Sequence, residues 1–435
     1  MTANRFCVTL LAWSALFATP VHAESLRDAI MTAIASNPQL RGEQDTVRGT
    51  AEGSVQARAA WQPVVSITAG AQYLREPYDS VDFAYPSVET NNGTAALNLS
   101  QPVYTGGKIA AQVRAADALT KAGGEALRAT EAQVIQSVVT SYMDVLRDST
   151  ILDIRRADLA SLRLQVANTR ARYNLGDAVT LTDVAQAETQ QQAAAAAEAA
   201  AQQQLDTSDA NYLAVVGEAP SNLVMPARLP DLPGSVDEAL QRAAVGNPTL
   251  AESKETARAA GADVDVARAA DLPNVAIQAS YGAIGPVSPF HTGQYQQNIS
   301  AMVTLTQSLY SGGLISSQIR AAEDQHEADQ QAAEGAARQA DQAVRTAWSQ
   351  VRNGEASITA GTAEVEAAKT ALRGDQAEYQ YGLRSTLDVL IADQNLRAAQ
   401  VGLVQSRHDT IVAEATLLEQ TGNLEANELL ESGGW

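Results

Sequence analysis

The stretch Gln101–Gly107, QPVYTGG, occurs twice in this chain and decides the fold. It returns 206 residues later as Gln307–Gly313, QSLYSGG, and a run of more than 60 residues without proline follows each copy. The glycine pairs Gly106-Gly107 and Gly312-Gly313 permit positive φ angles, which a sharp bend from a strand into a helix requires. Because a repeat fixes the architecture before any single motif does, we expect two copies of one unit in which a strand leads into a long helix.

Further matched motifs extend the repeat to nearly the whole chain. Asn37-Pro38 returns as Asn247-Pro248, 210 residues later, and Tyr173–Gly176 returns as Tyr379–Gly382. Between the copies, the segment 217–235 holds four prolines, whose fixed φ angle and missing N–H prevent a continued helix. We therefore expect four parts after residue 23: a first repeat over 24–216, a Pro-rich linker over 217–235, a second repeat over 236–421 and a tail over 422–435.

Each repeat is expected to hold two β-strands. From Val65 to Tyr73, apolar residues alternate with serine, threonine, glycine and glutamine, so one face of the strand suits lipid and the other suits water. Strands of about ten residues match a tilted membrane crossing, whereas hairpins at the edge of a soluble sandwich are the alternative. The strands are expected at about 64–74, 94–104, 274–282 and 298–309, with extracellular loops over 75–93 and 282–297.

Strands that enter a membrane would require an oligomer. No segment after residue 23 reaches the roughly 18 consecutive apolar residues of a transmembrane helix, so any crossing must be made by strands. Four strands cannot close a barrel, because an open edge in lipid leaves backbone groups unpaired at several kcal/mol each. Three copies would supply 12 strands. Tyr104 and Tyr310 belong to the motif where a strand becomes a helix, and they would then lie at the water interface of the membrane.

The proline-free runs predict two long helices, over roughly 107–173 and 313–379. At 1.5 Å per residue, each is on the order of 100 Å long. Gly176 and Gly382 are expected to end these helices and let the chain reverse at helical tips over 173–183 and 379–388. Heptad spacing predicts packing as coiled coils, and a coiled-coil rod unrelated to transport is the alternative if the helices are taken alone. The heptad residues are Val138, Val145, Leu152, Leu159 and Val166.

Capping residues are expected where each return helix begins. Ser385 with Asp388 at the second tip, and Asp183 with Gln186 at the first, have the residue types and spacing of capping pairs. An acid in the first turn also compensates the positive end of the helix dipole.

Residues 1–23 are typical of a secretory signal. Arg5 precedes an apolar run, and Val21-His22-Ala23 forms a small-residue cleavage site. The only cysteine, Cys7, lies inside this segment, so a mature chain beginning at Glu24 has no thiol for a disulfide, a metal or a lipid anchor. That chain carries 29 basic and 50 acidic residues, a formal charge of −21, which should repel nucleic acid.

We find no group of residues with the pattern of a catalytic or metal site. The four histidines are scattered, and no acid pair has a catalytic context. We therefore expect no enzyme, no cofactor and no metal. A periplasmic enzyme has no positive feature in its favour, and a secreted coiled-coil structural or adhesive protein without a pore is the main alternative to a channel.

The combination of doubled motifs, strand pairs and long helices resembles the TolC family of outer-membrane efflux proteins over essentially all of the mature sequence. The resemblance implies an α+β membrane protein: a homotrimer whose 12-stranded transmembrane β-barrel continues into a long periplasmic α-helical coiled-coil barrel. It also implies a passive exit duct through the outer membrane for a tripartite efflux pump or a type I secretion system. A periplasmic adaptor would dock around Leu175, Gly176, Gly382 and Leu383, and an inner-membrane transporter of the ABC, RND or MFS type would supply energy.

The segment 379–390 resembles the second tip of that family closely. The resemblance implies that Tyr379 and Arg384 bond to the first tip at Thr182-Asp183 and hold the periplasmic end closed. It further implies that Asp388 contributes a ring of three carboxylates near the pore axis, which would favour cations.

Two alternatives to this gate are open. Asp388 and Asp183 can act only as charges at helix N-termini, and Arg384 can be a solvated surface cation. Ile391 stands where the family has a second acid, so the resemblance leaves open whether this chain forms a second carboxylate ring.

Overall fold

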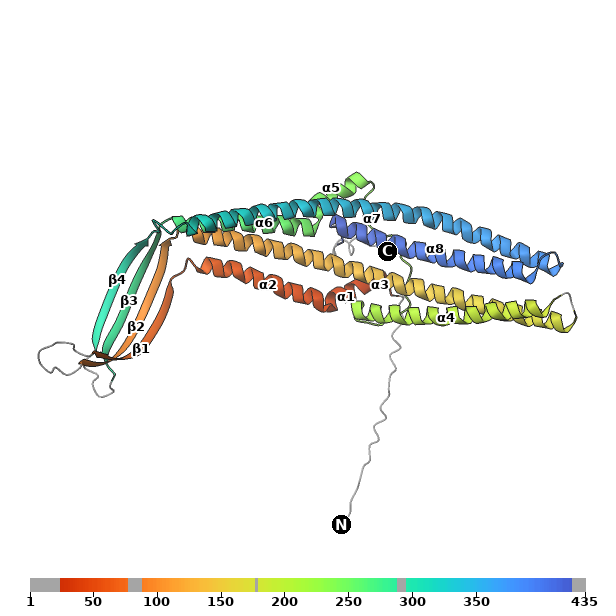
Figure 1. Cartoon of the computed structure of the whole chain (residues 1–435), viewed down its shortest axis with the longest axis horizontal. Coiled ribbons are helices and arrows are strands. Elements are labelled where there is room, and N and C mark those ends of the chain that lie inside the picture. The colour runs from red at the N-terminus through yellow and green to blue at the C-terminus, as the bar shows by residue number, and fades with distance from the viewer. Residues whose placement is uncertain (1–23, 77–87, 177–178, 288–294, 425–435) are drawn as a thin grey trace, which may run out of the picture.

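The chain folds into a slender molecule with a β-sheet at one end and, at the other end, the two turns that connect its long antiparallel helices (Figure 1). The computed structural model describes residues 24–76, 88–176, 179–287 and 295–424. Outside the described residues lie the expected signal segment 1–23 with Cys7, the middle parts of both expected extracellular loops (77–87 and 288–294) and residues 425–435 of the tail.

One antiparallel sheet contains the described strands in the order β1 (Val64–Glu76), β2 (Val88–Tyr104), β3 (Asn274–Pro286) and β4 (Gln296–Thr306). Each repeat contributes a hairpin, and β2 pairs with β3 to join the repeats. The hairpin registers match, because Val64 lies opposite Ser100 and Asn274 lies opposite Thr306. In the described sheet, β1 and β4 each have one edge without a partner strand.

The strands reach further toward their loops than the residue pattern indicated. Glycines and polar residues in these stretches predicted loops, but the ladder continues through them, with Gly93 opposite Gly285. Strand pairing depends more on neighbouring strands than on residue preference. At its other end β4 stops at Thr306 instead of 309, where its partner β3 begins at Asn274. Pro273, which precedes Asn274, has no N–H to extend the ladder.

Two helices of 67 residues each, α3 and α7, give the molecule its length. Asn37 and Asn247 are the N-caps of α2 and α6, and a proline occupies the first position of both helices. Within the described ranges, no helix is long and apolar enough to cross a membrane. The helices are α1 (Leu26–Ser36), α2 (Pro38–Ala59), α3 (Lys108–Asn174), α4 (Leu181–Val216), α5 (Val236–Gly246), α6 (Pro248–Arg268), the 3₁₀ helix η1 (Ala269–Asp271), α7 (Leu314–Gln380) and α8 (Thr386–Thr421).

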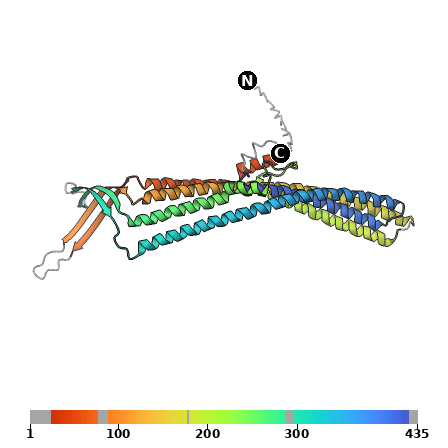
Figure 2. The same ribbon diagram turned by 90° about the horizontal axis from the view of Figure 1, so that it is seen from above.

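The four longest helices form two hairpins, α3–α4 and α7–α8, that lie side by side (Figures 1 and 2). The hairpins meet where α3 packs antiparallel against α8. Two contacts show the register of this seam: the Gln136 amide donates to the Thr416 hydroxyl at 3.1 Å, and His408 lies 3.0 Å from Asp144. The expected heptad residues of α3 are buried, as coiled-coil packing requires: Val138, Val145, Leu152, Leu159 and Val166.

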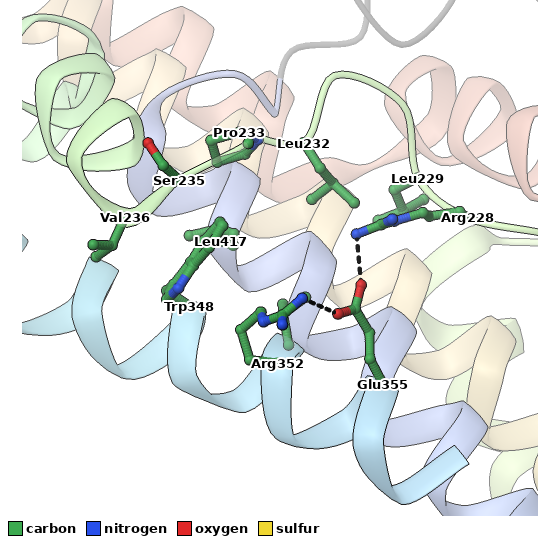
Figure 3. Close-up of a pocket in the computed structure, with 12 residues that line it drawn as sticks. Arg228, Leu229, Leu232, Pro233, Ser235, Val236, Trp348, Arg352, Glu355 and Leu417 are labelled. Atoms are coloured by element: carbon green, nitrogen blue, oxygen red, sulfur yellow. Dashed lines mark hydrogen bonds and ion pairs between the residues drawn. The ribbon is translucent and has the colours of Figure 1, made fainter. Parts of the chain in front are cut away.

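The linker 217–235 packs across the middle of the second hairpin (Figure 3). Arg228 of the linker donates to Glu355 of α7 at 3.0 Å, and Arg352 donates to the same carboxylate at 2.8 Å. Arg228 also pairs with Glu414 of α8 at 3.1 Å, and the backbone N–H of Leu229 donates to Glu414 at 3.0 Å. Beside these residues the linker and the hairpin enclose a groove of about 760 Å³. The linker therefore fixes both helices of the hairpin.

Candidate functional site: the helical tips

Both tips are built from the same sequence device. α3 ends at Asn174 and Gly176 follows with φ +76°, while α7 ends at Gln380 and Gly382 follows with φ +75°. A positive φ at this place ends a helix and reverses the chain, and glycine adopts it without steric cost. Both glycines therefore act as the sequence predicted.

The return helices begin with matching capping boxes. At the second tip, the backbone N–H of Ser385 donates to Asp388 at 2.9 Å and the Ser385 hydroxyl donates to the same oxygen at 2.8 Å. At the first tip, Thr180 and Asp183 make the equivalent bonds, both at 2.8 Å. The predicted pairing of Asp183 with Gln186 is therefore wrong. The helix begins three residues earlier than that pairing requires, so Asp183 is its third residue and not its cap.

The capping bonds set the ionisation of Asp388. The backbone N–H of Ser385 is the main cause that lowers the pKa of the Asp388 carboxyl, and the Ser385 hydroxyl adds to it. Hydrogen bonds donated to a carboxylate favour its charged form. A trimer would therefore bring three ionised groups to this level.

Arg384 finds its partners within its own hairpin. Its Nε donates to Glu378 at 2.9 Å and lies 3.4 Å from Asp375. The hydrogen bond to Glu378 is the main cause that raises the pKa of Arg384. Arg384, Asp375 and Asp388 line a groove of about 640 Å³ between α7 and α8, together with Ile391. The cation and the expected ring carboxylate thus share one surface near the tip.

Tyr379 contacts the first hairpin, but through a residue that the sequence did not single out. The guanidinium carbon of Arg172, on α3, lies 4.9 Å from the centre of the Tyr379 ring, within the range of a cation–π interaction. The Tyr379 hydroxyl lies 3.4 Å from that of Thr386. In the described part of the single chain, Tyr379 and Arg384 form no hydrogen bond or ion pair with Thr182 or Asp183, so the implied bonds between tips stay a prediction.

The outermost surface of the tips is apolar. The expected docking residues Leu175 and Leu383 are 84% and 74% exposed. Two further residues, which sequence reasoning missed, are also exposed: Tyr381 next to Gly382 is 82% exposed, and Leu181 at the start of α4 is 64% exposed. Exposed apolar side chains gathered at one end of a molecule are typical of a protein-binding surface.

The junctions between sheet and helices have the geometry that the doubled motif predicts. Gly106 and Gly312 both have φ +62°, and Gly107 and Gly313, with φ +85° and +87°, are the N-caps of α3 and α7. Tyr104 and Tyr310, one residue ahead of each Thr/Ser-Gly-Gly, are 46% and 90% exposed. Among the described residues, no group of three or more His, Cys, Asp or Glu could hold a metal ion.

Comparisons with known proteins agree with these features. The sequence model of the family described as "Outer membrane efflux protein" matches residues 29–218 and 239–423. The outer membrane efflux protein BepC of Brucella suis biovar 1 (strain 1330) is 32% identical over 420 residues, which cover 97% of this chain and 90% of that protein. The outer membrane protein TolC of Vibrio cholerae serotype O1 is 24% identical over 421 residues, 94% of this chain and 93% of that protein. The crystal structure of the Campylobacter jejuni CmeC outer membrane channel, at 16% identity, has the same fold with a TM-score of 0.82 over 94% of this chain and 88% of that chain.

Proposed function

Because the chain belongs to the outer membrane efflux protein family and is an outer-membrane efflux channel with a periplasmic extension, we propose that it works as a passive homotrimeric exit duct whose gate lies at the helical tips. The observation that carries the proposal is the fusion of an apolar-faced sheet with two open edges to helices on the order of 100 Å long. Ile67, Ile299 and Val303 on the sheet are 78%, 76% and 68% exposed, as side chains that face lipid would be in an isolated chain.

The internal repeat supports closure of the sheet by further copies. Within one chain, a Cβ at Gly106 would lie 2.6 Å from that of Leu272, so the first repeat already fits tightly against the second. Gly312, its counterpart, has no such neighbour within 4 Å in the described chain. If the repeat relation continues across an interface, the missing neighbour is Gln62 of the next copy. Three copies would supply the 12 strands of a closed transmembrane β-barrel.

The helices point to the same closed ring. Ion pairs join α2 to α3 (Arg58–Asp117, 2.8 Å), α3 to α6 (Arg114–Asp265, 2.7 Å) and α6 to α7 (Arg268–Glu323, 2.7 Å). These pairs place the helices in the order α2, α3, α6, α7, from the first repeat into the second. In a ring of copies, α2 of the next copy would pack against the free side of α7. The result would be a helical barrel continuous with the strands.

The gate is proposed at the tips because charged and aromatic residues of both hairpins meet there. In the trimer, Tyr379 and Arg384 would bond to Thr182-Asp183 and keep the end closed, and three Asp388 carboxylates would favour cations. The apolar surface of Leu175, Leu383 and their neighbours would receive a periplasmic adaptor, and an inner-membrane transporter of the ABC, RND or MFS type would supply energy. The duct would serve a tripartite efflux pump or a type I secretion system.

Planar-bilayer recording tests this proposal. Purified wild-type protein should insert as heat-sensitive trimers and conduct weakly, and Arg384→Ala should raise single-channel conductance by loosening the closed tip. Arg373→Ala is the matched control, because it removes an exposed cation from α7, the helix that precedes Arg384, and Arg373 forms no ion pair within the described residues. A protein that is extracted without detergent and forms no pore would favour the coiled-coil structural alternative. Equal conductance of wild type and Arg384→Ala would remove Arg384 from the gate.

A further inference from the structure

A charged layer interrupts the seam between α3 and α8. Toward the tips, Leu390 of α8 packs in a buried cluster with Leu159 and Leu162 of α3. Toward the linker, the seam belongs to the largest apolar core of the described structure. Charged side chains buried between two apolar stretches are costly to place, so they call for a specific role. The layer consists of Asp144, Arg147 and Asp148 on α3 with His408 and Asp409 on α8.

His408 joins the two hairpins through this layer. Its Nε2 lies 3.0 Å from Asp144 on α3, and its Nδ1 lies 2.8 Å from Asp409 on α8 itself. The imidazole side chain is only 9% exposed. Arg147 approaches the same Nε2 at 3.4 Å. The bond between His408 and Asp144 is therefore a partly buried polar tie between hairpins that otherwise meet through apolar packing at this level.

The α3 side of the layer is held rigidly. Arg147 donates to Asp148 through Nε at 2.7 Å and through its terminal nitrogen at 2.9 Å, and Ser208 of α4 donates to the same carboxylate at 2.6 Å. Burial alone would raise the pKa of Asp148, but these hydrogen bonds outweigh it and the pKa lies below its ordinary value. Arg147 and Asp148 thus stay charged near neutral pH, the range in which a histidine side chain changes its charge.

The neighbours of His408 favour its charged form. Burial alone would lower its pKa, but the hydrogen bonds with Asp144 and Asp409 outweigh burial and the charge of Arg147, so the pKa of His408 lies above its ordinary value. A neutral imidazole carries one N–H and can donate to only one of the two carboxylates, whereas the charged ring donates to both. Protonation therefore strengthens the tie between the hairpins.

Among the described residues, the contacts that α4 and α7 make at this level are uncharged. On α7, Gly354 lies against Thr410, which is two residues after His408 on α8. On α4, the uncharged Gln204 reaches Asp148 at 3.5 Å. Arg407, next to His408 in sequence, instead lines a groove beneath the linker with Glu414. In the described part of the chain, the charged groups bonded within this layer around His408 are thus three acids and one arginine, all on α3 and α8.

We propose that His408 is a clasp that ties α8 to α3, so that the duct opens less readily in acid and more readily above neutral pH. The proposal rests on the gated duct proposed above, because the tip of α8 must part from α3 when the duct opens. A histidine with a raised pKa stabilises the tied state fully below its ordinary pKa, and the contribution is lost as the pH rises through the raised value. If the pKa of His408 is one unit higher in the tied state than in the released state, protonation changes the equilibrium constant between the two states by about tenfold.

The test is single-channel recording from pH 5 to pH 8.5 in the Arg384→Ala background, where openings are expected to be frequent enough to count. Open probability should rise across this range with His408 present, by about tenfold for each unit by which the tie raises the pKa of His408, and His408→Gln should flatten the profile. Asp144→Asn should move its midpoint to lower pH, because the partner that raises the pKa of His408 loses its charge. His326→Gln is the matched control, since His326 of α7 bonds to Ala257 of α6 and lies outside the seam.

The outcomes separate this proposal from the proposed function. Pores whose pH profile is unchanged by both His408→Gln and Asp144→Asn would overturn the clasp and leave the duct intact. Loss of the pH dependence with His326→Gln instead would overturn it as well. If His408→Gln fails to assemble, the test uses Asp144→Asn and Asp409→Asn, which alter the more exposed partners of His408. Both should move the midpoint of the pH profile of open probability to lower pH, and an unchanged midpoint in both would overturn the clasp. Absence of pores in every variant and in wild type at all pH values would instead refute the proposed function.

Discussion

A disulfide between copies of the chain would test how the sheet closes. β1 and β3 correspond at an offset of 210 residues and β2 and β4 at 206, and the hairpin registers within the chain agree with these offsets. Leu97 of β2 lies opposite Tyr281 of β3. The corresponding residues are Val303 of β4 and Ala71 of β1. We therefore predict that Ala71 of one copy faces Val303 of the next, and that Ala71→Cys with Val303→Cys forms a disulfide.

The distances make the outcome specific to the trimer. Directly opposed residues of antiparallel strands have Cα atoms about 4.5–5.5 Å apart, inside the range of about 4.4–6.8 Å that a disulfide spans. Within one chain, β1 and β4 are separated by β2 and β3, and three strand spacings amount to about 14 Å. A disulfide within one chain is thus excluded. The register also brings the apolar face of β1 beside the apolar face of β4, as burial in lipid requires.

Oxidation of outer membranes that contain the double variant, followed by non-reducing gel electrophoresis after heating, should yield covalent dimers and trimers. The expected mature chain has no cysteine of its own, so only the two introduced cysteines can form a disulfide. The matched control is Ala71→Cys with Thr304→Cys, because a slip of one residue turns the second thiol to the opposite face of the sheet. Equal cross-linking of both pairs, or none in either pair while heat-sensitive trimers still form, would refute the register and with it the repeat-based closure.

Three further variants probe the junction, the first tip and the charged layer. Gly106→Ala should lower the melting temperature of the trimer by forcing a side chain to φ +62° and 2.6 Å from Leu272, a cost on the order of 1–3 kcal/mol, whereas Gly107→Ala meets open space and should cost less. Thr180→Ala should destabilise the start of α4 by about 1 kcal/mol, visible as faster amide exchange over 181–184. Asp148→Asn should lower the free energy of unfolding by about 1.5–3 kcal/mol, measured by denaturant titration, because it removes one charged partner of Arg147, which keeps its ion pair with Asp144 at 2.6 Å. In wild type this contribution is present above pH 3.8 and is lost as the pH falls through the lowered pKa of Asp148.

Much of the fold could be predicted because its decisive signals are local. The doubled glycine pairs predict positive φ angles at both junctions, and all four glycines have them. Alternating residues from Val65 to Tyr73 predict the first strand, and the proline-free runs predict α3 and α7. Each of these signals depends only on residues within a few positions of one another. The strand ends and the start of α4 were less certain, since pairing with a neighbouring strand and a cap three residues upstream decided them.

The contacts of the candidate gate could not be predicted from sequence spacing. Arg384 reaches Glu378 and Asp375 because the turn at Gly382 folds it back onto α7. The contact of Arg172 with Tyr379 and that of His408 with Asp144 join residues more than 200 positions apart. Only the packing of the second hairpin against α3 places these side chains together: α7 supplies Tyr379 and α8 supplies His408. The resemblance to a family supplied candidate residues, but not the partners that each one has in this chain.

The partners of Arg384 bear on what holds the tip closed. Its two carboxylate partners belong to its own hairpin, so any bond to the first tip must replace ion pairs that already exist. Exposed ion pairs contribute little, because water and salt screen them, and an exchange of one for another contributes less still. The seam above the tip is different, because Leu159, Leu162 and Leu390 bury apolar surface there and the tie between His408 and Asp144 is largely shielded from water. In the proposed duct, the seam would therefore stabilise the closed state more than the implied tip bonds would, and those bonds would act as a latch that small changes can release.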